Sequence, residues 1–157
     1  MQKISPCLWF DGAAEEAAQF YVSVFPNARI VGTTRYQEGA HRPAGTVMTV
    51  EFVLDGQEFL ALNGGPEFSF SPAISFVVPC ETQAQVDRLW ALLLAGGQAQ
   101  QCGWLTDKYG VCWQIVPKGL LAMMTASDPA ATQRATAAML KMVKLDIATL
   151  ERAYRGD

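Results

Sequence analysis

The spacing of apolar residues changes along the first part of the chain, and the change separates strands from a helix. Residues 4–10 (ISPCLWF) form a short apolar run typical of a strand, and residues 13–25 are apolar on one face only, as in an amphipathic helix. Three further strands are predicted at 28–36, 45–55 and 57–64. The Asp55-Gly56 pair between the last two favours a hairpin turn. The expected inward face of the helix consists of Ala17, Phe20, Tyr21, Val24 and Phe25.

The same order of elements returns in the second half of the chain. Residues 73–80 read as a strand, and Thr82 with Gln85 three positions later forms a capping box that predicts a helix start. The helix is expected over 85–94, with strands at 98–107 and 111–117. Superposing Phe20-Tyr21 on Leu89-Trp90 makes the chain two copies of a strand, a helix and three strands. The residues that would bury this second helix are Val86, Leu89, Trp90, Leu93 and Leu94.

The composition changes after Pro117. Asp128 and Pro129 are typical of the N-cap and first residue of a helix, which is predicted to run to about residue 145. One more short helix is expected before the end. The pattern indicates an α+β protein of 157 residues, read as a single domain with a first module at 1–66, a second at 67–117 and a C-terminal helical extension at 118–157.

Charge and cysteine spacing exclude several classes of function. The chain has 12 Lys and Arg against 15 Asp and Glu, so its net charge is -3. It therefore has no excess of positive charge that would attract nucleic acid or an anionic membrane. No apolar run reaches the roughly 20 residues of a membrane span, and the N-terminus lacks a signal-peptide pattern. We therefore expect a cytoplasmic protein whose partner is a small molecule. The cysteines Cys7, Cys80, Cys102 and Cys112 form no CxxC pair and are expected to be small buried side chains.

Several stretches together resemble a known family. The two modules, with GPEFSF between them and DKYGVCWQIVP at the last turn and strand, resemble the vicinal oxygen chelate superfamily, which includes glyoxalase I and ring-cleaving dioxygenases. LWFDGAAEEAAQFY, LNGGPEFSFSPAISF and AAMLKMVKLDIATLERAY are similar to the PhnB-like branch, whose members often carry the label 3-demethylubiquinone-9 3-methyltransferase. The resemblance implies two βαβββ modules that form a cupped, mixed eight-stranded sheet with helices on the outer face.

The resemblance also implies where ligands would lie. Enzymes of the superfamily bind a divalent metal through side chains on the first, fourth, fifth and eighth strands. Those positions fall here on Pro6 or Leu8, on Asn63, on Ser75 and on Gln114. None of these side chains is charged, whereas hard and borderline cations favour carboxylate or imidazole ligands. We therefore expect a pocket with no metal and no other cofactor, since His41, the only histidine, cannot form a metal site alone.

The alternation along the last strand divides its residues between two faces. If Val111, Trp113 and Ile115 face the helix, then Cys112 and Gln114 face the cup. Two alternatives stay open: Gln114 is a buried amide satisfied by neighbouring strands, or it contacts a ligand together with Asn63, whose side chain could instead close its own turn. The candidate ligand-binding residues are Leu8, Asn63, Ser75, Trp104, Cys112 and Gln114.

Expectations also follow for aromatic and acidic residues outside the candidate site. Phe68 and Phe70 alternate with polar residues and either line a pocket or fasten the two modules together. Trp113 is expected in the core. Asp107 is expected to form hydrogen bonds with the backbone of the turn before the last strand.

Two functions follow from these residues. The first is a metal-free protein that binds a small molecule of unknown identity. The second is an enzyme, either an isomerase or lyase of the superfamily or the methyltransferase of the family label, although no Gly-rich strand-to-helix loop for a nucleotide-like methyl donor is present. A homodimer is also expected, because one face of the helix beginning at Pro129 needs a surface to cover it. That face consists of Ala131, Ala135, Ala138, Met139 and Met142.

Overall fold

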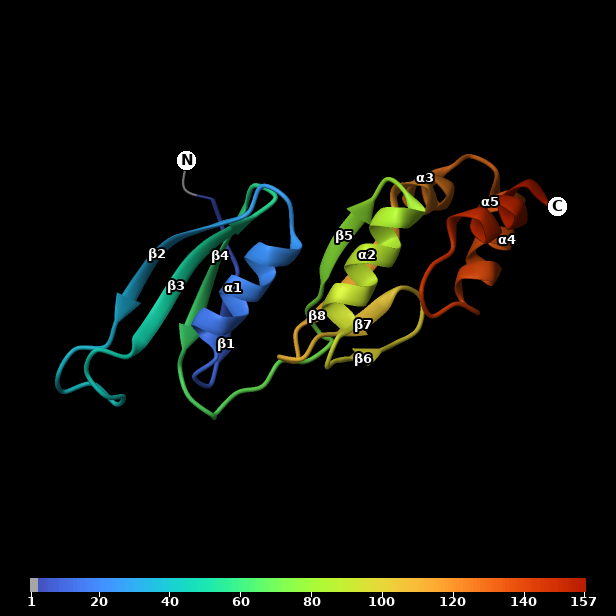
Figure 1. Cartoon of the computed structure of the whole chain (residues 1–157). Coiled ribbons are helices and arrows are strands. Elements are labelled where there is room, and N and C mark those ends of the chain that lie inside the picture. The colour runs from blue at the N-terminus through green and yellow to red at the C-terminus, as the bar shows by residue number, and fades with distance from the viewer. Residues whose placement is uncertain (1–2) are drawn as a thin grey trace. The chain divides into compact units, whose positions relative to one another are not determined.

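The computed structural model describes residues 3–157. The chain folds into two compact units (Figure 1). The first unit extends to Phe70 and the second runs from Ser71 to Asp157. The second unit contains both the second module and the C-terminal helices.

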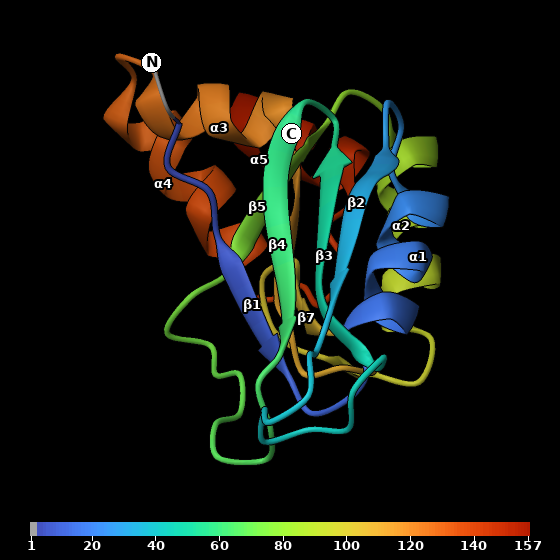
Figure 2. The ribbon, with the colours of Figure 1, turned by 90° about the vertical axis from the view of Figure 1, so that its left-hand side faces the viewer.

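The first unit is a four-stranded sheet with one helix on it. Strand β1 (Cys7–Phe10) leads into helix α1 (Ala14–Val24), and three strands follow. The strand order is β1-β4-β3-β2, with β1 parallel to β4 and the other pairs antiparallel. Figure 2 shows α1 covering one face of this sheet. The three strands are β2 (Arg29–Arg35), β3 (Val47–Leu54) and β4 (Gln57–Asn63).

The core of the first unit lies between α1 and the sheet. The ring of Tyr21, on α1, stacks on Phe52 of β3, and Phe52 stacks in turn on Phe59 of β4. Both strand residues therefore belong to the helix-covered face. Because side chains alternate along a strand, Ala61 and Asn63 point to that same face as Phe59. The buried residues of α1 are Ala14, Ala17, Ala18, Tyr21 and Val24, whereas Phe20 and Phe25 are half-buried.

The second unit repeats this order. Its strands are β5 (Phe76–Cys80), β6 (Gln98–Ala99), β7 (Trp104–Thr106) and β8 (Cys112–Pro117), and its first helix is α2 (Gln83–Leu94). The sheet order is β5-β8-β7-β6, with β5 parallel to β8. The fold is thus α+β, as expected, and within residues 3–157 its eight strands form two four-stranded mixed sheets, one in each predicted module, with five helices.

A tight turn divides the region that was predicted as one strand over 98–107. Cys102 (φ 59°) and Gly103 (φ 82°) both adopt left-handed backbone, which ends β6 and starts β7 in a new direction. Gly103 is required there, since a Cβ atom would lie 2.9 Å from the Ile115 carbonyl oxygen.

The predicted capping box at the start of α2 is present. The Thr82 side chain accepts a hydrogen bond from the Gln85 backbone N–H at 3.2 Å, and the Gln85 side chain accepts one from the Glu81 N–H at 2.7 Å. The Thr82 bond satisfies a backbone donor that the first helical turn leaves without a partner, and the Gln85 bond reaches the residue just before the N-cap. The helix buries Val86, Leu89, Trp90 and Leu93, as expected, while Leu94 is half-buried.

The C-terminal extension folds onto the second unit. Helix α3 (Lys118–Thr125) is followed by α4 (Pro129–Met139) and α5 (Ile147–Arg155). Helix α4 ends at Met139, not near residue 145 as predicted. Its caps confirm the start, because the Asp128 side chain accepts from the Ala131 N–H at 3.1 Å.

The small-residue face of α4 is covered within the chain. Ala131 and Ala135 are buried. The remaining members of that face pack on an apolar cluster formed by Val116, Leu120, Leu145 and Leu150. The argument that this face needs a second subunit to cover it is therefore wrong. The residues that pack on the cluster are Met123, Met124, Ala138, Met139 and Met142.

Candidate functional site

The turn between β7 and β8 fixes the position of the last strand. Asp107 is only 3 % exposed, and its carboxylate accepts hydrogen bonds from the backbone N–H groups of Tyr109 (2.8 Å) and Val111 (3.0 Å). The other carboxylate oxygen accepts from the Trp113 indole N–H at 2.9 Å. Asp107 thus serves the turn, as predicted, and it also holds a core tryptophan in one orientation.

The register of β8 separates its residues onto two faces. Trp113 pairs with Leu105 on β7 and with Phe76 on β5, and Trp113 and Leu105 are both buried. Gln114, the next residue, points to the opposite face, where it pairs with Trp104 and Val77. Gln114 and Trp104 are half-buried and Val77 is 50 % exposed.

We call this second surface the Gln114 face. It brings together four of the six predicted site residues, Trp104 from β7, Cys112 and Gln114 from β8, and Ser75 from the loop before β5. Because cross-strand partners share a face, Thr106 lies beside Cys112 on it as well. The Gln114 face consists of Ser75, Val77, Trp104, Thr106, Cys112 and Gln114.

Neutral hydrogen bonds organise the polar groups of the Gln114 face. The Gln114 amide donates to the Ser75 hydroxyl at 2.8 Å, which fixes the orientation of the amide. The Gln100 amide donates to the Thr106 hydroxyl at 2.6 Å, and the Cys112 sulfur lies 3.6 Å from the same hydroxyl. The face therefore offers amide and hydroxyl groups beside an indole and an aliphatic side chain, with no charged group among its members.

Leu8 and Asn63 lie elsewhere, in the first unit. Leu8 pairs with Ala61 and is buried on the face that α1 covers. Asn63 is buried on the same face, where its side-chain oxygen accepts from the Ala14 N–H at 2.9 Å and its amide donates to the Val47 carbonyl at 3.0 Å. Asn63 thus caps α1 from a distant strand, because Ala13 at the N-cap position has no side chain that could do so. Both side-chain bonds go to other elements, α1 and β3, so the Asn63 side chain does not close its own turn.

The cysteines differ in exposure more than the sequence suggested. Cys80 and Cys112 are buried, but Cys102 is half-buried and Cys7 is exposed, so the expectation of four buried side chains is wrong for these two. Burial raises the pKa of the Cys80 thiol above its ordinary value. Within residues 3–157, no group of three or more His, Cys, Asp and Glu side chains is placed to hold a metal ion.

The remaining predicted residues pack within the first unit. The ring of Phe68 meets Trp9 edge-on at 5.0 Å, and Phe70 meets Phe10 in the same way at 5.2 Å. His41 lies 3.2 Å from the Gly64 carbonyl oxygen, next to the Tyr36 ring. The two phenylalanine contacts fasten the segment after β4 to β1.

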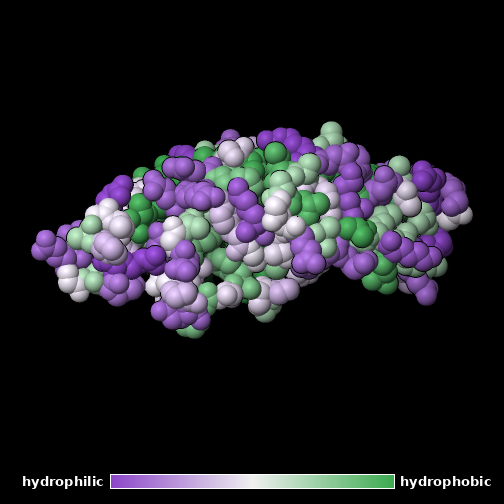
Figure 3. All heavy atoms as spheres, turned by 60° about the horizontal axis from the view of Figure 1, so that its bottom comes forward, coloured by the Kyte–Doolittle hydropathy of each residue, from purple (hydrophilic) through white to green (hydrophobic). Residues whose placement is uncertain are grey.

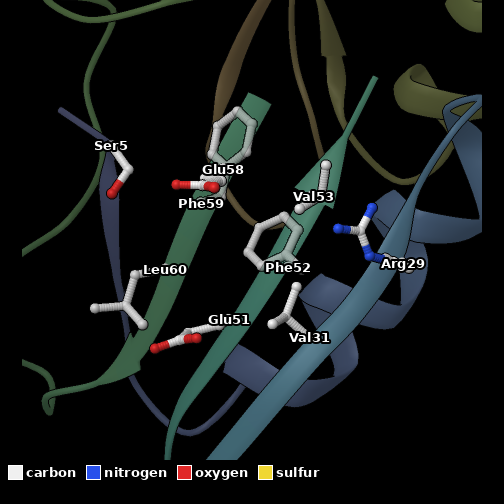
Figure 4. A pocket seen from close by; sticks show the side chains of 9 residues that line it. All are labelled: Ser5, Arg29, Val31, Glu51, Phe52, Val53, Glu58, Phe59 and Leu60. Atoms are coloured by element: carbon white, nitrogen blue, oxygen red, sulfur yellow. The ribbon is translucent and has the colours of Figure 1, made fainter. Parts of the chain in front are cut away.

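A hollow lies on the face of the first sheet that α1 leaves uncovered, and none of its lining residues is among the six predicted site residues. It measures about 330 Å³, and Figure 4 shows the side chains that line it. Arg29, Glu51 and Glu58 contribute charged groups from three adjacent strands. The available signal was the alternation of Glu51 and Glu58 with the apolar residues Phe52 and Phe59, which places both glutamates on the face away from α1. The remaining residues at its border are Ser5, Val31, Val53 and Leu60, together with Phe52 and Phe59, whose rings stack on the α1 side of the sheet.

Comparisons with known proteins agree with this fold. A family model described as 3-demethylubiquinone-9 3-methyltransferase matches residues 2–116. A structure described as a putative 3-demethylubiquinone-9 3-methyltransferase, PhnB protein, from Bacillus cereus is 39 % identical, covers 74 % of this chain and 99 % of its own, and superposes with a TM-score of 0.68. Among curated proteins, none matches the chain.

Two more distant structures share the fold. Protein PA1353 from Pseudomonas aeruginosa is 21 % identical, with a TM-score of 0.62 over 74 % of this chain and 98 % of its own. A fosfomycin resistance protein, FosX, from Listeria monocytogenes, solved with Mn(II) and sulfate, is 11 % identical, with a TM-score of 0.50 over 71 % of this chain and 86 % of its own. No helix within residues 3–157 is long and apolar enough to cross a membrane.

Proposed function

This chain belongs to the 3-demethylubiquinone-9 3-methyltransferase family, the PhnB-like branch of the vicinal oxygen chelate superfamily, and we propose that its second sheet binds a small uncharged ring compound. The observation that carries the proposal is the pairing of Gln114 with Trp104 across β8 and β7. An oriented amide beside a half-buried indole suits a flat molecule with polar ring substituents, because the indole offers a stacking surface and the amide offers directional hydrogen bonds.

The neutrality of the Gln114 face supports an uncharged ligand. A charged ligand would lose hydration without gaining an opposite charge from Ser75, Thr106 or Gln114, and that loss is costly. The bond between Ser75 and Gln114 holds the amide in place before any ligand arrives, so less side-chain freedom is lost on binding. Val77, which is half-exposed, adds apolar area to the same surface.

Calorimetric titration with a 3-demethylubiquinone analogue that lacks the isoprenoid tail tests the proposal. We expect saturable binding by the wild-type chain, and a dissociation constant at least about tenfold weaker, or about 1.4 kcal/mol, for Gln114→Ala and for Trp104→Ala. Gln101→Ala is the matched control, since Gln101 is exposed in the turn just before Trp104. Equal affinity of wild type and Gln114→Ala would contradict the proposal.

A methyltransferase is the second candidate, and the description of the matching family model favours it. The short connections from β1 to α1 (residues 11–13) and from β5 to α2 (81–82) contain one glycine between them, whereas nucleotide-like methyl donors are usually held at a glycine-rich strand-to-helix loop. Incubating the protein with the same analogue and S-adenosylmethionine, followed by mass spectrometry, separates the two candidates. A methylated product absent from the Gln114→Ala reaction would establish the enzyme.

We further propose a cytoplasmic homodimer. All four cysteines are free thiols, which suits a reducing compartment. Apolar side chains remain exposed near the C-terminal helices, where Leu121, Leu140 and Val143 are each more than two-fifths exposed, and Figure 3 shows apolar surface at that end of the chain. Such surface favours pairing with a second copy, because monomers rarely leave extended apolar patches in water.

A further inference from the structure

The hollow on the first sheet has an arrangement of charge that the Gln114 face lacks. Arg29, on β2, pairs with Val53 on β3, and Val53 pairs with Glu58 on β4. The guanidinium and the Glu58 carboxylate therefore start from positions two strands apart, about 10 Å between their Cα atoms, with an apolar side chain between them. Figure 4 shows Arg29 and Glu58 on opposite sides of Val53.

A second carboxylate completes the arrangement. Glu51 pairs with Leu60, two residues along the strands from the pairing of Val53 with Glu58. Diagonal neighbours of this kind on adjacent strands lie about 7–8 Å apart, so the two glutamates can approach one cationic group together. Val53 lies between Arg29 and Glu58, and Leu60 lies beside the two glutamates, so both add apolar surface to the hollow.

The three charged side chains have no competing partners within residues 3–157. Arg29, Glu51 and Glu58 are exposed, and none of them forms an ion pair or a side-chain hydrogen bond with another described residue. Their charges are thus available to a ligand. One positive and two negative groups beside apolar surface match a molecule with an ammonium group, an anionic group and an aliphatic part.

We propose that this hollow binds a small zwitterion of the α-amino acid type. The ammonium group lies between Glu51 and Glu58, the carboxylate faces the Arg29 guanidinium, and the aliphatic side chain covers Val53 and Leu60. The planar guanidinium suits a carboxylate because it can donate two parallel hydrogen bonds. A volume of about 330 Å³ is at the lower end for small-molecule pockets, which suits a ligand of this size.

L-leucine is the probe, and chemical shift perturbation in two-dimensional NMR of the full chain is the measurement. We expect saturable shifts of the backbone amides of β2, β3 and β4. Removing either charge from the probe tests the arrangement: leucine methyl ester, which lacks the carboxylate, should bind about tenfold more weakly. The anion 4-methylpentanoate, which lacks the ammonium group, should bind more weakly still because it meets two carboxylates.

Substitutions assign the contacts. Arg29→Gln and Glu58→Gln should each weaken L-leucine binding about tenfold, and Glu15→Gln, on the exposed side of α1, should leave it unchanged. Gln114→Ala should also leave it unchanged, which separates this site from the proposed function of the second sheet. The absence of saturable shifts with millimolar L-leucine, or equal affinity for L-leucine and 4-methylpentanoate, would overturn the proposal.

Discussion

The contact between Asp107 and Trp113 allows a quantitative prediction about the stability of the second unit. Replacing Asp107 with Asn keeps an oxygen that accepts from the backbone N–H groups of Tyr109 and Val111. The new NH₂ group, however, then faces the indole N–H, so two donors meet where an acceptor and a donor stood. A hydrogen bond to a charged acceptor contributes about 1.5–3 kcal/mol, and we expect Asp107→Asn to lower the free energy of unfolding by that amount.

Asp107→Ala removes both carboxylate oxygens, which accept three hydrogen bonds in and beside the turn. The bonds to the Val111 N–H and to the Trp113 indole are both buried, so their loss together costs about 3–6 kcal/mol, a large share of the 5–15 kcal/mol typical of a domain. Trp113→Ala should cost about 3–5 kcal/mol, since the ring is buried in the core. These two variants should therefore destabilise the second unit far more than Gln114→Ala, whose side chain is half-exposed.

Urea unfolding followed by tryptophan fluorescence measures these effects, because Trp90, Trp104 and Trp113 all lie in the second unit. Asp55→Asn is the control: Asp55 lies in an exposed turn at φ 46°, which asparagine also tolerates, so the change should stay within about 0.5 kcal/mol. A double-mutant cycle with Trp113→Phe isolates the bond. Losses from Asp107→Asn and Trp113→Phe that simply add would refute the assignment of the effect to this contact.

Three further predictions concern other positions. Gly103→Ala should lower the free energy of unfolding in urea by about 1–3 kcal/mol, because the backbone is left-handed there and the new Cβ would meet the Ile115 carbonyl oxygen. Gly119→Ala is the control: Gly119 lies in helix α3 with open space around it, so this change should be neutral or stabilising. Asn63→Ala should cost about 1–3 kcal/mol and slow-exchanging amides at the start of α1 should lose protection, since the bonds to Ala14 and Val47 are lost. The hydrogen bonds from Thr149 lower the pKa of Asp146. The ionised Asp146 carboxylate therefore stabilises the fold above the ordinary carboxyl pKa, and this stabilisation is lost as the pH falls through the lowered pKa. An Asp146→Asn variant whose urea midpoint falls as much as that of wild type between pH 5 and 2 would contradict this.

The order of elements could be predicted from sequence because its signals are local. The capping box at Thr82 and Gln85, the hairpin at Asp55-Gly56 and the turn at Asp107 each depend on residues a few positions apart. The role of Asn63 could not be predicted in this way. It depends on a bond across 49 positions of sequence to a helix whose own N-cap residue is an alanine.

The face of Leu8 and the end of α4 depended on tertiary contacts as well. The run ISPCLWF is apolar on both sides, so its composition does not show which residues point toward α1. Helix α4 is followed by no proline or glycine, yet it ends at Met139. The Met142 and Val143 carbonyls accept from the backbone N–H groups of Cys102 and Gly103, at 2.9 and 2.7 Å, so these carbonyls bond to the turn before β7 and not within a helix.

Truncation of the C-terminal helices is not a valid test of the proposed homodimer. Removing residues 118–157 would uncover Val116, which the C-terminal helices bury, so a truncated chain would associate or unfold for reasons unrelated to a native interface. Leu140→Glu is the better variant, because Leu140 is 60 % exposed and its replacement leaves the buried cluster intact. A buried charge at Ala135, by contrast, should unfold the extension. Light scattering at micromolar concentration should give a dimer for wild type and a monomer of unchanged circular dichroism for Leu140→Glu. A monomeric wild type would refute the homodimer, and a Leu140→Glu dimer would place its interface away from the end of α4.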